Sequence, residues 1–196
     1  MDLILASASP RRKELLARLG LPFSIQISNA EEQTEGPWMM LALENAFLKA
    51  EEVAARYPES VVVGADTVIE FESRILGKPR DLADAERMLT MFSGKTHAVT
   101  TGCAVICRSR NLRVRFAETA QVTFRRLSSE TVRRYLSLVS VFDKAGAYAI
   151  QEHGELIIER CEGDPDTVVG LPVTRLGETL KLFSGMEFFR KNAEIR

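Results

Sequence analysis

The hydrophobic and polar positions change period several times along the chain, as expected when strands and helices follow one another. Residues 23–28 alternate strictly between apolar and polar side chains, which is typical of a half-buried strand. Residues 61–69 are almost wholly apolar and predict a strand covered on both faces. Residues 37–56 are rich in Ala, Leu and Glu and predict a long helix. This mixture predicts an α/β fold.

Capping and turn residues set the limits of the other elements. A short strand at 2–6 leads into a helix from Pro10 to about Leu19, with Ser9 as N-cap and Gly20 as terminator. Because hairpins interrupt the alternation of strands and helices, we expect a mixed sheet rather than a wholly parallel one. The remaining predicted elements are a turn with a short return strand at 70–75, a helix capped by Asp81 and stopped by Ser93-Gly94, two long antiparallel strands at 97–107 and 112–124, a helix capped by Ser128 or Ser129, short strands at 147–150 and 156–161, and a last helix at 172–183.

Length and charge narrow the classes of function. The 196 residues, with 45% apolar content, suit a single domain over 1–196, or two small lobes that share a core. The 26 basic and 27 acidic residues nearly cancel to a net charge of −1, which argues against a dedicated DNA or RNA binder. Any phosphate ligand must therefore be met by local positive charge.

Targeting and cysteine usage point to the cytoplasm. The chain has no apolar run near the ~20 residues of a membrane span, and its first residues lack the regions of a secretory signal. The three cysteines are an odd count without CxxC spacing, so we expect neither a disulfide framework nor a zinc site. Cys103 and Cys107 share strand parity and are expected to be buried filler.

Asp66 is the most unusual polar residue, because it interrupts the apolar strand at 61–69. A buried carboxylate is costly unless it is paired or bound to a metal. Two interpretations remain: Asp66 caps a loop at the strand end, or it is a metal ligand or general base with Thr67 supplying a hydroxyl beside it.

Two loops rich in positive charge precede helices. In the first, small residues including Ser7 and Ser9 lead to Arg11 and Arg12 in the first helical turn, where the backbone N–H groups and the helix dipole favour an anion such as phosphate. The second is Gly77-Lys78-Pro79-Arg80-Asp81, which lacks P-loop spacing. The alternative for both is solvated surface charge, and Lys49 on the 37–56 helix is unremarkable by itself.

Other polar residues could serve a metal or a base. Glu31 and Glu32 lie in an acidic loop and are either solvated or, with Asp66, an oxygen-ligand site for Mg²⁺. Gln151 follows the small-residue segment 143–150, and a glutamine side chain offers a donor and an acceptor to the edge of a base.

Seven segments in order resemble the Maf family of nucleoside triphosphate pyrophosphatases, and they span most of the chain. No single piece is decisive, but seven in order make chance a poor explanation. The segments are LILASASPRRKELL at 3–16, Lys49, VVVGADTVI at 61–69, GKPRD at 77–81, SGKTHAVTTG at 93–102, DKAGAYAIQ at 143–151 and VVGLPV at 168–173.

The resemblance implies a mixed twisted sheet of the inosine-triphosphatase type in two lobes that flank a cleft, usually as a homodimer. It implies cleavage of a nucleoside triphosphate between the α and β phosphates with a divalent cation, Mg²⁺, Mn²⁺ or Co²⁺. By the same resemblance Asp66 is the general base, and Glu31 or Glu32 joins it at the metal. The residues implied to hold the phosphates are Ser7, Ser9, Arg12, Lys49 and Lys78.

Three positions distinguish branches of the family. The branch directed at dTTP and UTP resembles this chain at Arg11, Thr67 and Gln151, and the alternative branch, directed at 7-methyl-GTP, carries a tryptophan-type residue, glutamine and glutamate there. Glutamine suits the O4/N3 edge of thymine or uracil. Ala149 and Glu152-His153 depart from glycines that the family often has, and the tyrosine it often has near 164–166 is missing. These departures bear on the ranking of substrates, modified pyrimidine nucleotides included. The family's association with septum formation adds a second alternative, a nucleotide-binding regulator of cell division.

Overall fold

The computed structural model describes residues 2–183, and these form two compact units. Unit 1 holds the chain up to Asp66, Thr101–Glu118 and the chain from Gly170, and unit 2 holds Thr67–Thr100 and Thr119–Val169. In chain order the elements are β1 (Leu3–Leu5), α1 (Pro10–Ala17), β2 (Ser24–Ile25), α2 (Trp38–Arg56), β3 (Val61–Phe71), β4 (Arg74–Leu76), α3 (Leu82–Phe92), β5 (Thr96–Cys107), β6 (Leu112–Phe124), α4 (Ser129–Leu138), β7 (Ile158–Glu162), α5 (Pro165–Val169) and α6 (Val173–Lys181), with 3-10 turns at Arg108–Arg110, Ala145–Ala147 and Gly154–Leu156.

A seven-stranded sheet of mixed direction runs in the order β2-β1-β3-β5-β6-β7, with β4 added beside β3. Strand β1 is parallel to β2 and β3, whereas β4 and β7 are antiparallel to their partners β3 and β6. The side-chain pairs Thr96–Thr123 and Thr100–Thr119 place β5 and β6 antiparallel, because residue numbers rise on one strand as they fall on the other. The predicted mixed α/β class is confirmed.

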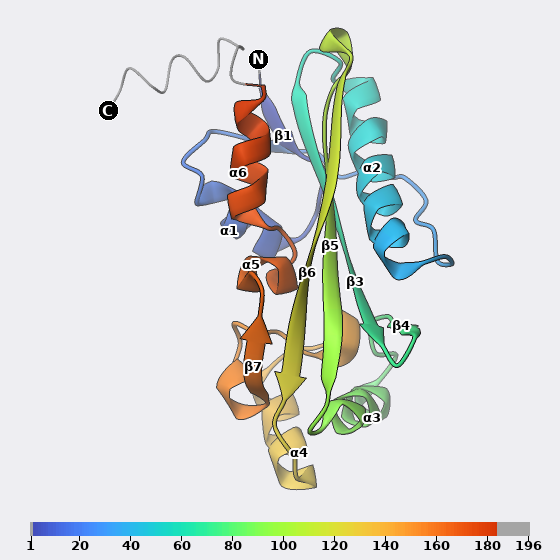
Figure 1. The fold of residues 1–196 in the computed structure, drawn as a ribbon, viewed down its shortest axis with the longest axis vertical. Coiled ribbons are helices and arrows are strands. Elements are labelled where there is room, and N and C mark those ends of the chain that lie inside the picture. Colours follow the sequence, from blue (N-terminus) through green and yellow to red (C-terminus); the bar gives the residue numbers. More distant parts are fainter. Residues whose placement is uncertain (1, 184–196) are drawn as a thin grey trace. The chain divides into compact units, whose positions relative to one another are not determined.

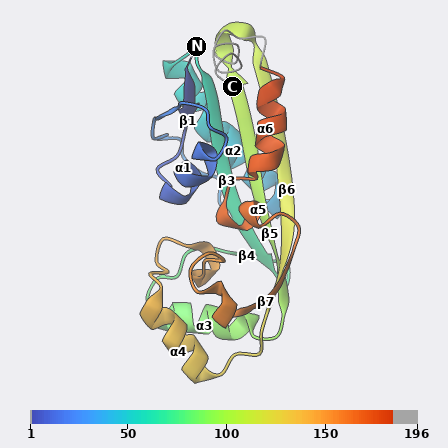
Figure 2. The same cartoon turned by 90° about the vertical axis from the view of Figure 1, so that its left-hand side faces the viewer.

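Unit 1 depends on a close approach between a helix and a strand. A Cβ at Gly64 of β3 would overlap the Ala46 carbonyl oxygen and lie 2.8 Å from the Ala50 nitrogen, so only glycine allows α2 to pack this closely. Ala46 and Ala50 are fully buried there with Val53 and Val62. Figures 1 and 2 show α2 on one side of the unit 1 strands and α1 and α6 on the other.

Unit 2 is built around aromatic side chains. Phe92 at the end of α3 contacts Phe71, Phe124, Tyr148 and His97, the last as a stacked ring 4.2 Å away. Helices α3 and α4 pack side by side in this unit (Figure 2). His97 Nε2 lies 2.8 Å from the Tyr148 hydroxyl, and burial lowers the pKa of His97 to about 3, so its imidazole is neutral at physiological pH.

Three predicted elements differ in the structure. The strand expected at 147–150 is wrong: a 3-10 turn covers Ala145–Ala147, and the left-handed φ of 60° at Ala147 interrupts the extended backbone that a strand needs. The strand at 23–28 shrinks to the two residues of β2, because this edge segment is largely exposed. Helix α1 ends at Ala17, two residues before the predicted end, and α5 was not predicted.

Most other elements appear as predicted. Asp81 and Ser128 cap α3 and α4 by accepting from the backbone nitrogens of Asp84 and Thr131. Strand β3 is buried from Val61 to Asp66, as its apolar run predicts. Cys103 and Cys107 are buried free thiols, in agreement with their expected role as filler. Within residues 2–183 no helix is long and apolar enough to span a membrane.

Candidate active site

Asp66 lies in the buried part of β3 and meets two side chains from α2. Its Oδ1 is 2.7 Å from Lys49 Nζ, and its Oδ2 accepts a 3.4 Å hydrogen bond from Asn45 Nδ2. The Asp66 and Lys49 side chains are each only 12% exposed. This carboxylate is therefore paired through long-range contacts and does not act as a loop cap.

The spacing within α2 explains how its two residues reach one carboxylate. Asn45 and Lys49 are four residues apart and so lie on one face of the helix, one turn from each other. The close approach at Gly64, two residues before Asp66, brings this helical face against β3. The glycine in the GAD sequence at 64–66 is thus a structural condition for the cluster.

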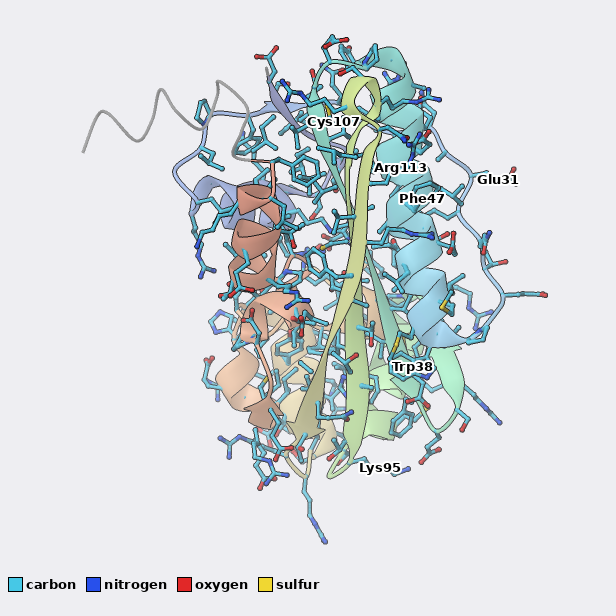
Figure 3. The ribbon with its side chains drawn as sticks, turned by 45° about the horizontal axis from the view of Figure 1, so that its top comes forward. Glu31, Trp38, Phe47, Lys95, Cys107 and Arg113 are labelled. Carbon is cyan, nitrogen blue, oxygen red and sulfur yellow. The ribbon has the colours of Figure 1, made fainter. Side chains whose placement is uncertain are left out.

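Glu32 reaches the same ammonium group from the loop that follows β2. Its Oε1 lies 2.8 Å from Lys49 Nζ, so one ammonium contacts two carboxylates from separate segments. Glu31 is exposed and points away from the unit, as Figure 3 shows. Of the two predicted loop acids, the structure brings Glu32 to the Asp66 cluster.

The carboxylates of Asp66 and Glu32 both contact the Lys49 ammonium, so the position between them already holds a cation. Within residues 2–183 no three His, Cys, Asp or Glu side chains gather closely enough to hold a metal ion by themselves. Mg²⁺ is usually bound by one or two carboxylates with water and substrate phosphates as further ligands. The oxygens of Asp66 and Glu32 fit that pattern in charge and in chemical type.

The start of α1 forms a second polar group in unit 1. Ser9 is the N-cap and its hydroxyl accepts from the Arg12 backbone nitrogen at 3.4 Å, while Pro10 occupies the first helical position, both as predicted. Ser7 is buried, and its hydroxyl accepts from the Ser9 backbone nitrogen at 3.2 Å and from Arg12 Nη1 at 3.3 Å. The loop is therefore ordered by its own serines.

Arg12 is held in place by the turn that precedes α6. Its Nε donates to the Gly170 carbonyl oxygen at 2.9 Å. Burial lowers the pKa of the Arg12 guanidinium, while the charges of Asp66 and Glu32 act to raise it. Positive charge from α1 thus belongs to the same electrostatic environment as the Asp66 cluster, and Arg11 adds a like charge beside Arg12.

Unit 2 holds the other predicted site residues. Thr67 is half-buried directly after Asp66, whereas Lys78 and Gln151 are exposed. The loop of Lys78 and the turn before Gln151 are joined, because Gly146 N–H donates to the Gly77 carbonyl at 3.0 Å. Tyr135 of α4 is fully buried, and its hydroxyl accepts from Ala149 N at 3.0 Å and donates to Ala149 O at 3.3 Å.

Sequence reasoning missed Asn45 and the Gly170 carbonyl. Asn45 had a detectable signal, since it is a polar residue in the otherwise apolar stripe of buried α2 positions. The Gly170 carbonyl had none, because a backbone acceptor 158 residues away from Arg12 leaves no trace in the pattern of side chains.

The fold and the polar cluster can now be compared with known proteins. A HAM1 protein from Coxiella burnetii has a similar fold, with a TM-score of 0.56 at 13% identity, over 92% of this chain and 98% of that one. This likeness defines the fold class, a mixed α/β protein of the HAM1 type. The family model described as Maf-like protein matches residues 2–183, and the chain belongs to that family.

Curated relatives match at higher identity. A dTTP/UTP pyrophosphatase from Akkermansia muciniphila is 46% identical over 94% of this chain and 96% of its own length. One from Bacillus cytotoxicus is 45% identical over 92% of this chain and 94% of its own. One from Bacillus cereus is 44% identical over 93% of this chain and 90% of its own.

Proposed function

We propose that this protein is a nucleoside triphosphate pyrophosphatase that hydrolyses dTTP and UTP to the monophosphate and pyrophosphate. The observation that carries the proposal is the Asp66–Lys49–Glu32 cluster in unit 1, in a chain that is 44–46% identical to curated dTTP/UTP pyrophosphatases over almost its whole length.

Asp66 is the proposed general base. Its carboxylate accepts a proton from a water molecule as the water oxygen bonds to phosphorus, and the oxygen bridging the α and β phosphates leaves with pyrophosphate. The contacts from Lys49 and Asn45 fix the orientation of this carboxylate, so little reorganisation is needed when the water binds.

We assign the phosphates to the loop before α1 and to Lys49 in unit 1, and the family resemblance adds Lys78 of unit 2. Ser7 and Ser9 shape the loop before α1, and Arg12 presents a guanidinium fork whose orientation the Gly170 carbonyl fixes. Lys49 and Lys78 supply further positive charge. These groups stabilise the negative charge that moves onto the leaving pyrophosphate.

A divalent cation, Mg²⁺, Mn²⁺ or Co²⁺, is proposed to bind at the carboxylates of Asp66 and Glu32. When bound, it would withdraw charge from the phosphate oxygens and lower the pKa of coordinated water. Lys49 carries the compensating positive charge at these carboxylates in the structure.

Base selection is assigned to Arg11, Thr67 and Gln151. Gln151 is exposed, so its amide can donate to O4 and accept from N3–H of thymine or uracil. The backbone before Gln151 is fixed, because Tyr135 binds both polar groups of Ala149. A homodimer is proposed from the family resemblance alone, and light scattering of the purified protein tests it. A cytoplasmic location is proposed from the targeting and cysteine features of the sequence.

A panel of nucleotides tests the function. Pyrophosphate release is measured from dTTP, UTP, CTP, dATP, GTP and 7-methyl-GTP, each with Mg²⁺, Mn²⁺ or Co²⁺. We expect dTTP and UTP to give the highest kcat/KM. Preference for 7-methyl-GTP would contradict the roles of Arg11, Thr67 and Gln151, and nucleotide binding without pyrophosphate release would favour a regulatory protein instead.

A further inference from the structure

Asn45 is a buried polar side chain that contacts Asp66 and the loop residue that follows Glu32. It is 3% exposed, and it lies in a helix face otherwise made of Leu41, Ala42, Ala46 and Ala50. A buried amide costs free energy unless its polar atoms are satisfied. The contacts of the Asn45 amide must therefore compensate for the cost of its burial.

The Asn45 amide binds both backbone groups of one loop residue. Its Oδ1 accepts from Gln33 N–H at 2.7 Å, and its Nδ2 donates to the Gln33 carbonyl at 3.0 Å. The same Nδ2 lies 3.4 Å from Asp66 Oδ2. One side chain thus links the loop, one residue after Glu32, to the proposed general base.

The loop needs such a link, because its side chains are not packed. Every residue from 31 to 36 is exposed, so no apolar burial fixes the position of Glu32. The preceding part of the loop is tied to α2 through Asn29 N–H, which donates to Glu52 at 3.3 Å. Asn45 ties the following part, and Glu32 lies between the two ties.

From these contacts we propose that Asn45 is a positioning residue that holds the Glu32 carboxylate and Asp66 at a fixed separation. This inference rests on the proposed function for its catalytic consequence. Its structural part, that Asn45 holds the loop and creates a two-carboxylate cation site, stands independently of any reaction.

The change Asn45→Leu removes the hydrogen bonds and keeps the branching and the number of heavy atoms of the side chain. Since Gln33 is exposed, water can satisfy its backbone groups in the variant, and a leucine suits the apolar face of α2. We therefore expect the Tm to stay the same or to rise. The matched control is Val53→Ala, which destabilises the same helix through a fully buried position without touching the loop.

Three measurements are made on the full chain of each variant. These are the hydrogen-exchange rate of the Gln33 amide by NMR, the affinity for Mn²⁺ alone by electron paramagnetic resonance, and kcat and KM for dTTP. In Asn45→Leu we expect faster exchange at Gln33 and losses of about 10- to 100-fold in Mn²⁺ affinity and in kcat. In Val53→Ala we expect a lower Tm with exchange at Gln33, Mn²⁺ affinity and kcat near those of the wild type.

The results separate the two claims. Unchanged Mn²⁺ affinity in Asn45→Leu, or equal losses in Val53→Ala, would overturn the positioning role. If wild-type protein releases no pyrophosphate from any nucleotide, the proposed function fails, while the exchange and Mn²⁺ measurements still decide whether Asn45 builds the carboxylate site.

Discussion

Asp66 in unit 1 and Asp84 in unit 2 are both buried carboxylates, yet they obtain their partners in opposite ways. The arginines that bind the Asp84 carboxylate are within four residues of it: Arg80 donates to its Oδ2 through the backbone N–H and Nε, both at 3.2 Å, and Arg87 donates to its Oδ1 at 2.6 Å. Asp66 is bound by Lys49 and Asn45, 17 and 21 residues away on another element.

The difference supports the proposal that Asp84 serves the structure and Asp66 the chemistry. Asp84 lies in the first turn of α3 with arginines from its own helix and the preceding loop, and such local pairs complete a helix terminus. At Asp66 of β3, side chains from α2 and from the loop after β2 come together. Separate elements converging on a buried carboxylate are what a catalytic constellation requires.

Apart from a change at Asp66 itself, the largest expected effect concerns Lys49. Lys49→Met removes the ammonium that contacts Asp66 and Glu32, and we expect kcat for dTTP to fall about 10²- to 10³-fold, because preorganised positive charge is lost. The matched control is Lys95→Met, which breaks an exposed pair with Glu72 in unit 2 and should leave turnover unchanged. Equal activity in the two variants would remove Lys49 from the site.

A smaller effect separates the neighbouring loop acids. Glu32→Gln removes the carboxylate on Lys49 and is expected to lower activity about tenfold and to raise the Mg²⁺ concentration for half-maximal rate. Glu31→Gln changes an exposed side chain and should have the smaller effect. Mg²⁺ titrations of both variants decide the matter, and a larger loss in Glu31→Gln would assign the metal to Glu31 instead.

We expect a substitution of Asp84 to change the stability of the fold and to leave the rate of hydrolysis unchanged. Asp84→Asn loses the ion pairs with Arg80 and Arg87 and should lower the Tm measured by circular dichroism. The kcat per folded molecule should match that of the wild type. A large loss of kcat in folded Asp84→Asn protein would contradict the structural role that we assign to Asp84.

The smallest expected effect is on acid stability. The hydrogen bonds from Arg87 and from the Arg80 backbone lower the pKa of Asp84 to about 2 from an ordinary value of 3.8. Between these values the unfolded chain binds a proton that the folded chain does not, so this stability is present above about pH 4 and lost as pH falls towards 2. Urea unfolding of Asp84→Asn should show a shallower pH slope in that window than wild type, and equal slopes would contradict the assignment.

The sequence predicts much of this contrast, but not all of it. The apolar run around Asp66 marks it as a costly carboxylate, and Asp81 before an amphipathic helix identifies the cap of α3, because both signals are local. The family resemblance implied that Asp66 and Lys49 belong to one site, but it assigned Lys49 to the phosphates, so their direct contact was not predicted. Only the packing of α2 at Gly64 brings those two residues together, and residue patterns do not encode such a distance.

The elements that sequence patterns misjudge share a physical cause. The segment 147–150 has strand-like composition, yet the hydroxyl of Tyr135 takes both backbone groups of Ala149, which leaves them unavailable to a sheet. Glu32 and Glu31 are equivalent as sequence, and the contact of Glu32 with Lys49 distinguishes them. In each case a tertiary contact overrides the local signal.

The most direct test of the account is the rate of pyrophosphate release from dTTP by Asp66→Asn beside Asp84→Asn, per folded molecule. We predict a loss of about 10²- to 10⁴-fold for Asp66→Asn, since an amide cannot accept the proton of the attacking water, with its circular dichroism unchanged. Asp84→Asn should keep the wild-type rate. Near-wild-type turnover by a folded Asp66→Asn would contradict the assignment of the chemistry to Asp66.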